Sequence, residues 1–272
     1  MTARIRIVSG QWRSRRWTGI ARWAIPRLIG VIVVGALLGA PASAFKISPF
    51  TAEMAPAGAR ATLDYVVEND SSDSTAVQIG VVKREQAEDG TETLSPAEDQ
   101  FLVFPAQLVL LPREKRTVRV QWLGPVKPDK ELAYRLIAEQ LPVDLGRPGT
   151  ARNSLKLLVK YQTAVYILPP DVHADPAHDL VVQRAEPGRD TRGRPTLDLS
   201  VANRGLAHIN LRGVRVTARS GDGKSVILSP AQVGTMMGEN VLSGSVRRFA
   251  VAWPPELAVG PVSATLEVQG AP

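Results

Sequence analysis

One stretch near the middle of the chain limits the possible folds more than any other. Between residues 155 and 167, the odd-numbered positions are mostly large and apolar, whereas several even-numbered positions are polar. Alternation of this kind is typical of a β-strand with one buried face. A strand of this length would span roughly 43 Å, more than twice the length of an ordinary strand. Pro169 and Pro170 end it, because proline removes a backbone donor from a sheet. We therefore expect a long strand with an edge that serves more than its own sheet.

The rest of the chain after residue 45 favours an all-β fold, because short alternating runs are separated by Gly, Pro, Asn and Asp. Before the long stretch, strands are predicted at 61–69, 75–83, 101–104, 107–111, 116–122 and 133–141. After it, strands are predicted at 180–184, 196–203, 209–217, 225–228, 246–253 and 262–268, with a hairpin turn at Asp222-Gly223. A spacing near ten residues is typical of β-sandwiches. We predict two Ig-like β-sandwich domains in tandem, at residues 45–169 and 170–272.

Residues 1–44 have the features of a secretory signal peptide. They contain seven arginines and no acidic residue, and the apolar run 28–40 is followed by Ala42-Ser43-Ala44, which matches an A-x-A cleavage site. A membrane anchor is the alternative, but the apolar run has 13 residues, fewer than the roughly 20 needed to span a bilayer. We expect cleavage and export, with the general and twin-arginine routes both open.

The charge and composition exclude several classes of function. Without the seven N-terminal arginines, 26 basic residues face 26 acidic ones, so the net charge of +7 does not indicate nucleic-acid binding. The chain has no cysteine, which excludes thiolate nucleophiles and disulfides. No familiar catalytic motif is present, so we expect no enzyme activity, no small-molecule substrate and no cofactor.

Three polar features have ordinary structural explanations. The stretch 171–179 contains His173 and His178 among three aspartates, but it lies in a proline-containing joint without the rigid frame that a metal site needs, so we expect no metal. His208 is expected at the surface or in a turn. Arg135 is expected on the solvated face of its strand.

Three phrases, taken in order, resemble the periplasmic pilus-assembly chaperones of the PapD-like family. They are Phe104–Val120, Leu132–Pro142 and Leu155–Pro169, and the pattern from Lys160 to Tyr166 is similar to a divergent branch of that family. The resemblance implies a periplasmic chaperone that lends its long strand to pilin-like subunits and delivers them to an outer-membrane usher. The side chains that it implies for the subunit groove are Leu155, Leu157, Val159 and Tyr161. Self-capping by dimerisation is left open.

The chain departs from the family where most members hold the subunit's C-terminal carboxylate with an Arg and a Lys. The matching positions are Thr51 and Ala164, neither of which carries a charge. Lys46, Lys160 and Thr51 are the candidate carboxylate contacts that remain. An interdomain charge cluster of the family is also incomplete: Glu131 and Glu256 match its acids, but Leu168 stands where an Arg is expected.

Two alternatives belong to other classes of protein. A secreted structural or adhesive Ig-like protein would use its strands only for its own fold. A metal-dependent hydrolase would need zinc bound at a site such as residues 171–179.

Overall fold

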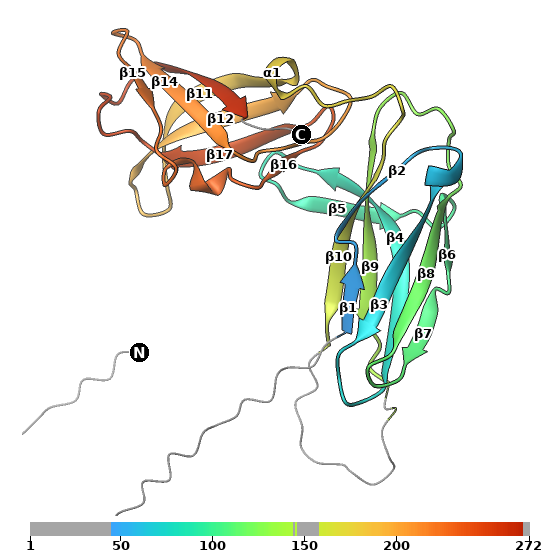
Figure 1. Ribbon diagram of the computed structural model, residues 1–272. Coiled ribbons are helices and arrows are strands. Elements are labelled where there is room, and N and C mark those ends of the chain that lie inside the picture. Colours follow the sequence, from blue (N-terminus) through green and yellow to red (C-terminus); the bar gives the residue numbers. More distant parts are fainter. Residues whose placement is uncertain (1–44, 144, 146–157, 269–272) are drawn as a thin grey trace, which may run out of the picture. The chain divides into compact units, whose positions relative to one another are not determined.

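The computed structural model describes residues 45–143, 145 and 158–268, which form two β-sandwiches (Figure 1). These residues belong to one compact unit. The strands of the first sandwich are β1 (Phe45–Ser48), β2 (Thr51–Met54), β3 (Thr62–Asn69), β4 (Thr75–Gln86), β5 (Glu92–Pro96), β6 (Phe101–Phe104), β7 (Gln107–Leu110), β8 (Lys115–Trp122), β9 (Leu132–Gln140) and β10 (Lys160–Ile167). One turn of 3-10 helix, η1 (Ala59–Ala61), precedes β3.

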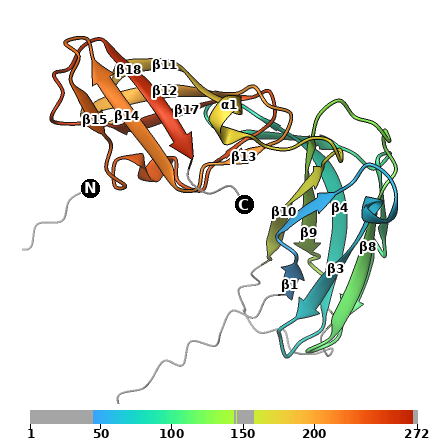
Figure 2. The same ribbon diagram turned by 45° about the horizontal axis from the view of Figure 1, so that its top comes forward.

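Two sheets make up the first sandwich. One has the strand order β1-β3-β8-β6, and the other has the order β2-β10-β9-β4-β5, with β7 also pairing with β4. The chain crosses from the first sheet to the second between Ser48 and Thr51, so β1 and β2 are edge strands of different sheets. The β2–β10 pair is parallel, whereas β10 runs antiparallel to β9 (Figure 2).

The core of the first sandwich is apolar and rich in aromatic residues. Phe101 packs edge-on against Trp122 and Tyr134, with ring centroids 5.0 and 4.9 Å apart. Burial raises the pKa of Tyr134 to about 12, and its hydroxyl donates to the Gln100 side chain over 2.6 Å. Aromatic side chains bury large areas, and buried tyrosines need a partner for the hydroxyl, so this cluster gives the domain its interior without a disulfide.

The second sandwich is built around a separate core. Its strands are β11 (Leu180–Arg189), β12 (Pro195–Asn203), β13 (Ile209–Asn210), β14 (Val214–Ser220), β15 (Ser225–Ile227), β16 (Asn240–Val241), β17 (Val246–Ala252) and β18 (Val262–Val268). They form the sheets β11-β12-β17, β15-β14-β18 and the two-stranded β13-β16. The short helices are α1 (Pro176–Asp179) and η2 (Val233–Thr235). Leu197, Leu199, Val201 and Leu211 are fully buried in the core.

The predicted fold class, two Ig-like β-sandwiches, is confirmed. The predicted strand 209–217 is wrong in one respect, because it divides into β13 and β14 at Gly213, which has a φ of 63°. β1, β2, β5 and β16 were not predicted, and the joint after Pro170 contains one turn of helix. No helix within the described ranges has the length and apolar character needed to cross a membrane.

The long strand differs most from its prediction. β10 contains eight residues, and Leu158 and Val159 come before it without strand structure. Leu155 and Leu157 lie outside the described residues. The alternation of the early part of the stretch does not continue through the second half of β10, where every residue from Thr163 to Ile167 is buried. Val165 and Ile167 face the core of the first sandwich, while Ala164 and Tyr166 pack with Leu242 of the second.

Candidate functional site

The two edges of β10 are covered to different extents. β9 pairs with the whole strand, but β2 pairs only with Ala164–Ile167. The Val159 carbonyl accepts from the Gln140 N–H over 2.9 Å on the β9 side, and the Ala164 N–H donates to the Phe50 carbonyl over 3.0 Å on the other side. Because backbone groups alternate in direction along a strand, even-numbered residues point away from β9.

Lys160 and Gln162 therefore direct their backbone groups to a side where no backbone partner occurs within the described part of the chain. We call this side of residues 160–163 the open edge. An unpaired strand edge is a template for the addition of another strand.

The apolar face of β10 continues to the open edge. Tyr161 is half-buried and packs edge-on against Phe45 and Phe50, with centroids 5.1 and 5.8 Å away. Val159 is also half-buried against the core, while Phe50 is 58% exposed. The core of the first sandwich thus ends at Val159 and Tyr161, the two predicted donor residues that the structure describes. Any chain added at the open edge would extend this apolar face.

Two positions predicted from the family pattern lie side by side. Thr51 of β2 and Ala164 of β10 are direct partners in the parallel ladder, and Ala164 is in turn the partner of Arg135 in β9. Thr51, Ala164 and Arg135 therefore form one row across the sheet, on one face. Ala164 of β10 carries no charge, but the guanidinium group of Arg135 belongs to its direct neighbour in β9.

The two candidate lysines lie elsewhere. Lys46 is on β1, in the other sheet, and forms an ion pair with Asp70. Lys160 is on the same face as Ala164, with its ammonium 3.4 Å from the Glu139 carboxylate. Both lysines thus form ion pairs with acidic residues outside the row at Ala164.

Arg135 belongs to an ionic group that we call the arginine cluster, made of Arg84, Glu92 and Arg135. Arg135 donates twice to Glu92, over 2.9 and 2.6 Å, and Arg84 contacts the same carboxylate at 2.7 Å. Burial alone would raise the pKa of Glu92, but hydrogen bonds and charge from the two guanidinium groups outweigh it and lower that pKa. Thr51, Ala164 and the arginine cluster line one cleft of about 370 Å³.

The arginine cluster was not predicted. Arg135 was expected on a solvated face, yet its side chain is 19% exposed and Arg84 is 4% exposed. The available signal for the cluster in the sequence was Arg135, a charged residue within a predicted strand. It could not be used from the sequence alone, because the contact depends on the register among β4, β5 and β9.

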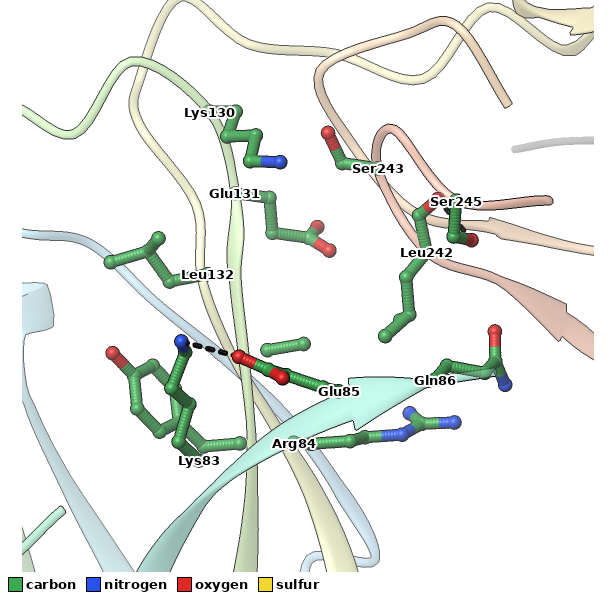
Figure 3. Close-up of a pocket in the computed structure, with 12 residues that line it drawn as sticks. Lys83, Arg84, Glu85, Gln86, Lys130, Glu131, Leu132, Leu242, Ser243 and Ser245 are labelled. Carbon is green, nitrogen blue, oxygen red and sulfur yellow. Dashed lines mark hydrogen bonds and ion pairs between the residues drawn. The ribbon is translucent and has the colours of Figure 1, made fainter. Parts of the chain in front are cut away.

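A second polar group surrounds Glu131, which the resemblance had marked as an acid of the interdomain cluster. The Glu131 carboxylate accepts from the Nδ1 and the backbone N–H of His208, over 2.7 and 3.1 Å. The His208 ring stacks on Tyr166, and its side chain is only 16% exposed. Of the predicted surface or turn position, the surface position is wrong, whereas the residue does lie in the loop between β12 and β13. Figure 3 shows an adjoining pocket of about 280 Å³, lined in part by Arg84, Glu131 and Leu242.

The histidines of the joint form local contacts. His178 Nδ1 lies 2.7 Å from the Asp175 carboxylate at the start of α1. Within the described ranges, no three His, Asp or Glu side chains converge in a way that could hold a metal ion.

Comparison with known families finds a match in the first sandwich. Residues 54–173 match the family model described as pili and flagellar-assembly chaperone, PapD N-terminal domain. The first sandwich is therefore similar to the PapD N-terminal domain over 120 of the 272 residues of the chain. The matched range of this PapD-like domain contains the arginine cluster and all of β10, including the open edge.

One solved structure supports this fold, and two others are similar with lower scores. A chain of the CsuC–CsuE chaperone–tip adhesion subunit complex of Acinetobacter baumannii is similar, with a TM-score of 0.52, 17% identity, and coverage of 79% of this chain and 90% of that one. The Salmonella enterica SafA pilin–SafB chaperone complex gives a TM-score of 0.49 at 20% identity, covering 77% and 84%. The Escherichia coli chaperone DraB gives 0.47 at 20% identity, covering 77% and 85%. No curated protein sequence matches the chain.

Proposed function

We propose that the chain is a periplasmic chaperone that binds pilus or fimbrial subunits by donor-strand complementation and passes them to an outer-membrane usher. The observation that carries this proposal is the open edge of β10 in a PapD-like domain. A subunit that lacks a strand has an apolar groove and unpaired backbone groups. The open edge offers complementary backbone groups beside an apolar face. No chemical reaction is needed, so the protein is not an enzyme under this proposal.

The energy of such a contact comes from two sources. Backbone hydrogen bonds from Lys160 and Gln162 contribute roughly 0.5–1.5 kcal/mol each. Apolar side chains that fill groove pockets contribute more, about 1.5–3 kcal/mol for each one fully buried. Val159 and Tyr161 are already half-buried in their own domain, so they have less surface left to give. Leu155 and Leu157 are therefore proposed as the main groove residues.

The arginine cluster supplies a candidate contact for the subunit's C-terminal carboxylate. Arg135 lies beside Ala164. Ala164 is the position at which the family places a lysine. A guanidinium binds a carboxylate through two parallel hydrogen bonds, and Glu92 occupies Arg135 in this way in the free protein. We propose Arg135 and Arg84 for this role in addition to Thr51 and Lys160. Lys46 is a weaker candidate, since it is in the other sheet.

A pair of proline substitutions tests the open edge directly. Gln162→Pro removes an N–H that points away from β9, so the domain should keep its ladder and its melting temperature. Thr163→Pro removes an N–H that points toward β9 and should destabilise the domain. With a pilin-like subunit co-expressed in the periplasm, Gln162→Pro should reduce the co-purified subunit about tenfold, the loss expected from one backbone hydrogen bond at the upper end of its range.

Full recovery of the subunit with a folded Gln162→Pro protein would exclude strand addition at this edge. A secreted structural protein is the competing function, and it predicts that no subunit is recovered with the wild-type chain. Leu157→Arg separates the two further: it should abolish recovery without unfolding the isolated protein if Leu157 is lent to the subunit. If it unfolds the isolated protein, Leu157 belongs to the protein's own core.

A further inference from the structure

The second sandwich contacts β10 through one small element and the adjoining Leu242. β13 and β16 pair with each other at Ile209↔Val241 and Asn210↔Asn240, and we call this pair with the adjoining His208 the β13–β16 ribbon. The His208 ring lies parallel to the Tyr166 ring at 3.8 Å, with an interplanar angle of 11°. Asn240 Nδ2 donates to the Tyr166 hydroxyl over 2.6 Å. Tyr166, which is 1% exposed, is thus held from its face and from its tip by the ribbon, and its hydroxyl also accepts from Arg84 of β4 over 3.2 Å.

Glu131 fixes the His208 ring. Its side chain is 1% exposed, and a buried carboxylate is costly unless hydrogen bonds satisfy it. A carboxylate only accepts, so the Nδ1 of His208 carries the proton in the 2.7 Å contact. The Glu131 N–H also donates to the Leu206 carbonyl over 2.8 Å, which ties the start of β9 to the loop before His208. The hydrogen bond from His208 to Glu131 therefore fixes the orientation in which the His208 ring stacks on Tyr166.

The position of Tyr166 in β10 gives this arrangement a consequence for the open edge. Tyr166 is four residues from Gln162 in the same strand. Between them, support from β2 ends at Ala164, so the open edge has β9 as its only neighbouring strand in the described part of the chain. A segment paired on one edge opens more easily than one paired on both. Its order therefore depends on how firmly the covered half of β10 is held.

We infer that the β13–β16 ribbon positions the open edge through Tyr166, with His208 and Glu131 as positioning residues for subunit capture. The link to capture rests on the proposed function, whereas the link to β10 does not. The second sandwich then has a role in binding without touching the subunit. Removing the imidazole should loosen β10 while the core of the second sandwich stays intact.

Amide hydrogen exchange on the full chain without any subunit tests the first link. The N–H groups of Tyr161 and Thr163 point toward β9 and report on the ladder next to the open edge. His208→Ala should speed their exchange about tenfold relative to wild type, and amides of Leu197–Val201 should be unchanged. His178→Ala is the matched control, because His178 is an exposed histidine of the same part of the chain that bonds only to Asp175. Unchanged exchange at Tyr161 and Thr163 would overturn the inference, as would equal acceleration at Leu197–Val201.

Conservative variants separate positioning from general damage and remain informative if His208→Ala does not fold. His208→Phe keeps a ring on Tyr166, and His208→Gln keeps a donor to Glu131. Each should restore part of the protection at Tyr161 and Thr163. If neither variant protects these amides better than His208→Ala, the stacked arrangement does not hold β10. Where His208→Ala does not fold, wild-type exchange at Tyr161 and Thr163 in both variants leads to the same conclusion.

Subunit capture tests the second link. A co-expressed pilin-like subunit should be recovered in lower yield with His208→Ala than with His178→Ala. Faster exchange with undiminished recovery would refute the positioning role while leaving the proposed function intact. No recovery even with the wild-type chain would refute the proposed function, and the exchange result would still decide the link to β10.

Discussion

At the scale of single residues, Glu92 determines the charge balance of the arginine cluster. Two guanidinium groups contact its carboxylate, and they hold its pKa below the 4.5 of an ordinary glutamate. The carboxylate is thus more stable in its charged form when the protein is folded than when it is unfolded. Stabilisation from a lowered pKa is present above the unfolded-state value and is lost as the pH falls through the folded-state value.

Glu92→Gln should therefore destabilise the protein at neutral pH and have less effect in acid. The amide cannot pair with both guanidinium groups, so Arg84 is left buried with a charge that lacks its partner. Thermal unfolding of wild type and variant between pH 7 and pH 3 measures this, and the two melting temperatures should converge below pH 4.5. Glu98→Gln, at an exposed position, is the control. A difference in melting temperature that stays constant with pH would contradict the ionic role of Glu92.

Much of the residue-scale detail could not be predicted, for a physical reason. Alternation is a local property, so the strand at 61–69 was placed within one residue of β3. Contacts between strands depend on register, which alternation does not specify. Arg135 therefore appeared to be a solvated residue until its row with Ala164 and Thr51 was known. His208 was misjudged for the same reason, because its partners Glu131 and Tyr166 are far away in the sequence.

At the scale of elements, a buried asparagine ends one strand in each sandwich, and its side chain forms the same kind of hydrogen bonds in both. β3 ends at Asn69, whose Oδ1 accepts from the Ser71 N–H while its Nδ2 donates to the Leu110 and Leu111 carbonyls. β12 ends at Asn203, whose Oδ1 accepts from the Gly205 N–H while its Nδ2 donates to two further carbonyls. Both asparagines are fully buried. Each closes a turn and satisfies backbone groups that a strand end leaves unpaired.

Replacing either asparagine should be costly for this reason. Asn69→Ala leaves several backbone groups without a partner, each worth about 1–3 kcal/mol when buried, so we expect a loss of roughly 3 kcal/mol. Asn203→Ala should cost a similar amount in the second sandwich. Urea unfolding measures both, with Asn69→Asp as a variant that keeps the acceptor but loses the donors. A loss near zero for Asn69→Ala would show that water satisfies these groups instead.

The prediction of β10 illustrates what an element-scale pattern can and cannot reveal. The alternation and the Pro169-Pro170 end were sufficient to predict a strand that ends at Ile167, where β10 ends. They could not show that the strand changes its surroundings at Thr163, because burial of both faces requires knowing that Leu242 and Ala164 meet. The predicted donor residues Leu155 and Leu157 remain predictions.

At the scale of the whole molecule, a hairpin of the first sandwich braces the second. The turn between β4 and β5 contains Glu88, whose backbone carbonyl accepts from the Arg248 N–H over 2.6 Å and whose carboxylate pairs with the Arg248 side chain at 2.9 Å. Arg248 is on β17, an edge strand, so the turn covers part of an edge that would otherwise be unpaired. Together with the β13–β16 ribbon, this gives the two sandwiches two separate polar attachments.

Gly90 makes the close approach in this turn possible, and its replacement tests the brace. Gly90 has a φ of 91°, and a Cβ placed there would lie 2.4 Å from a terminal nitrogen of Arg247. Arg247 cannot easily move, because it is 4% exposed and its guanidinium donates to Glu239 and to the Asn240 carbonyl. Gly90→Ala should cost roughly 1–2 kcal/mol for the backbone conformation and a further 1–3 kcal/mol for the displaced hydrogen bonds.

Gly193→Ala is the matched control for that experiment, since Gly193 has a φ of 77° but no atom within 4 Å of the added Cβ. It should cost only the backbone term, and urea unfolding of the two variants gives the difference. If the brace couples the sandwiches, Gly90→Ala should also divide one unfolding transition into two, because domains that lose their contacts unfold independently. Equal losses for both glycines, with one transition in each, would mean that Arg247 yields freely and that the turn does not couple the two sandwiches.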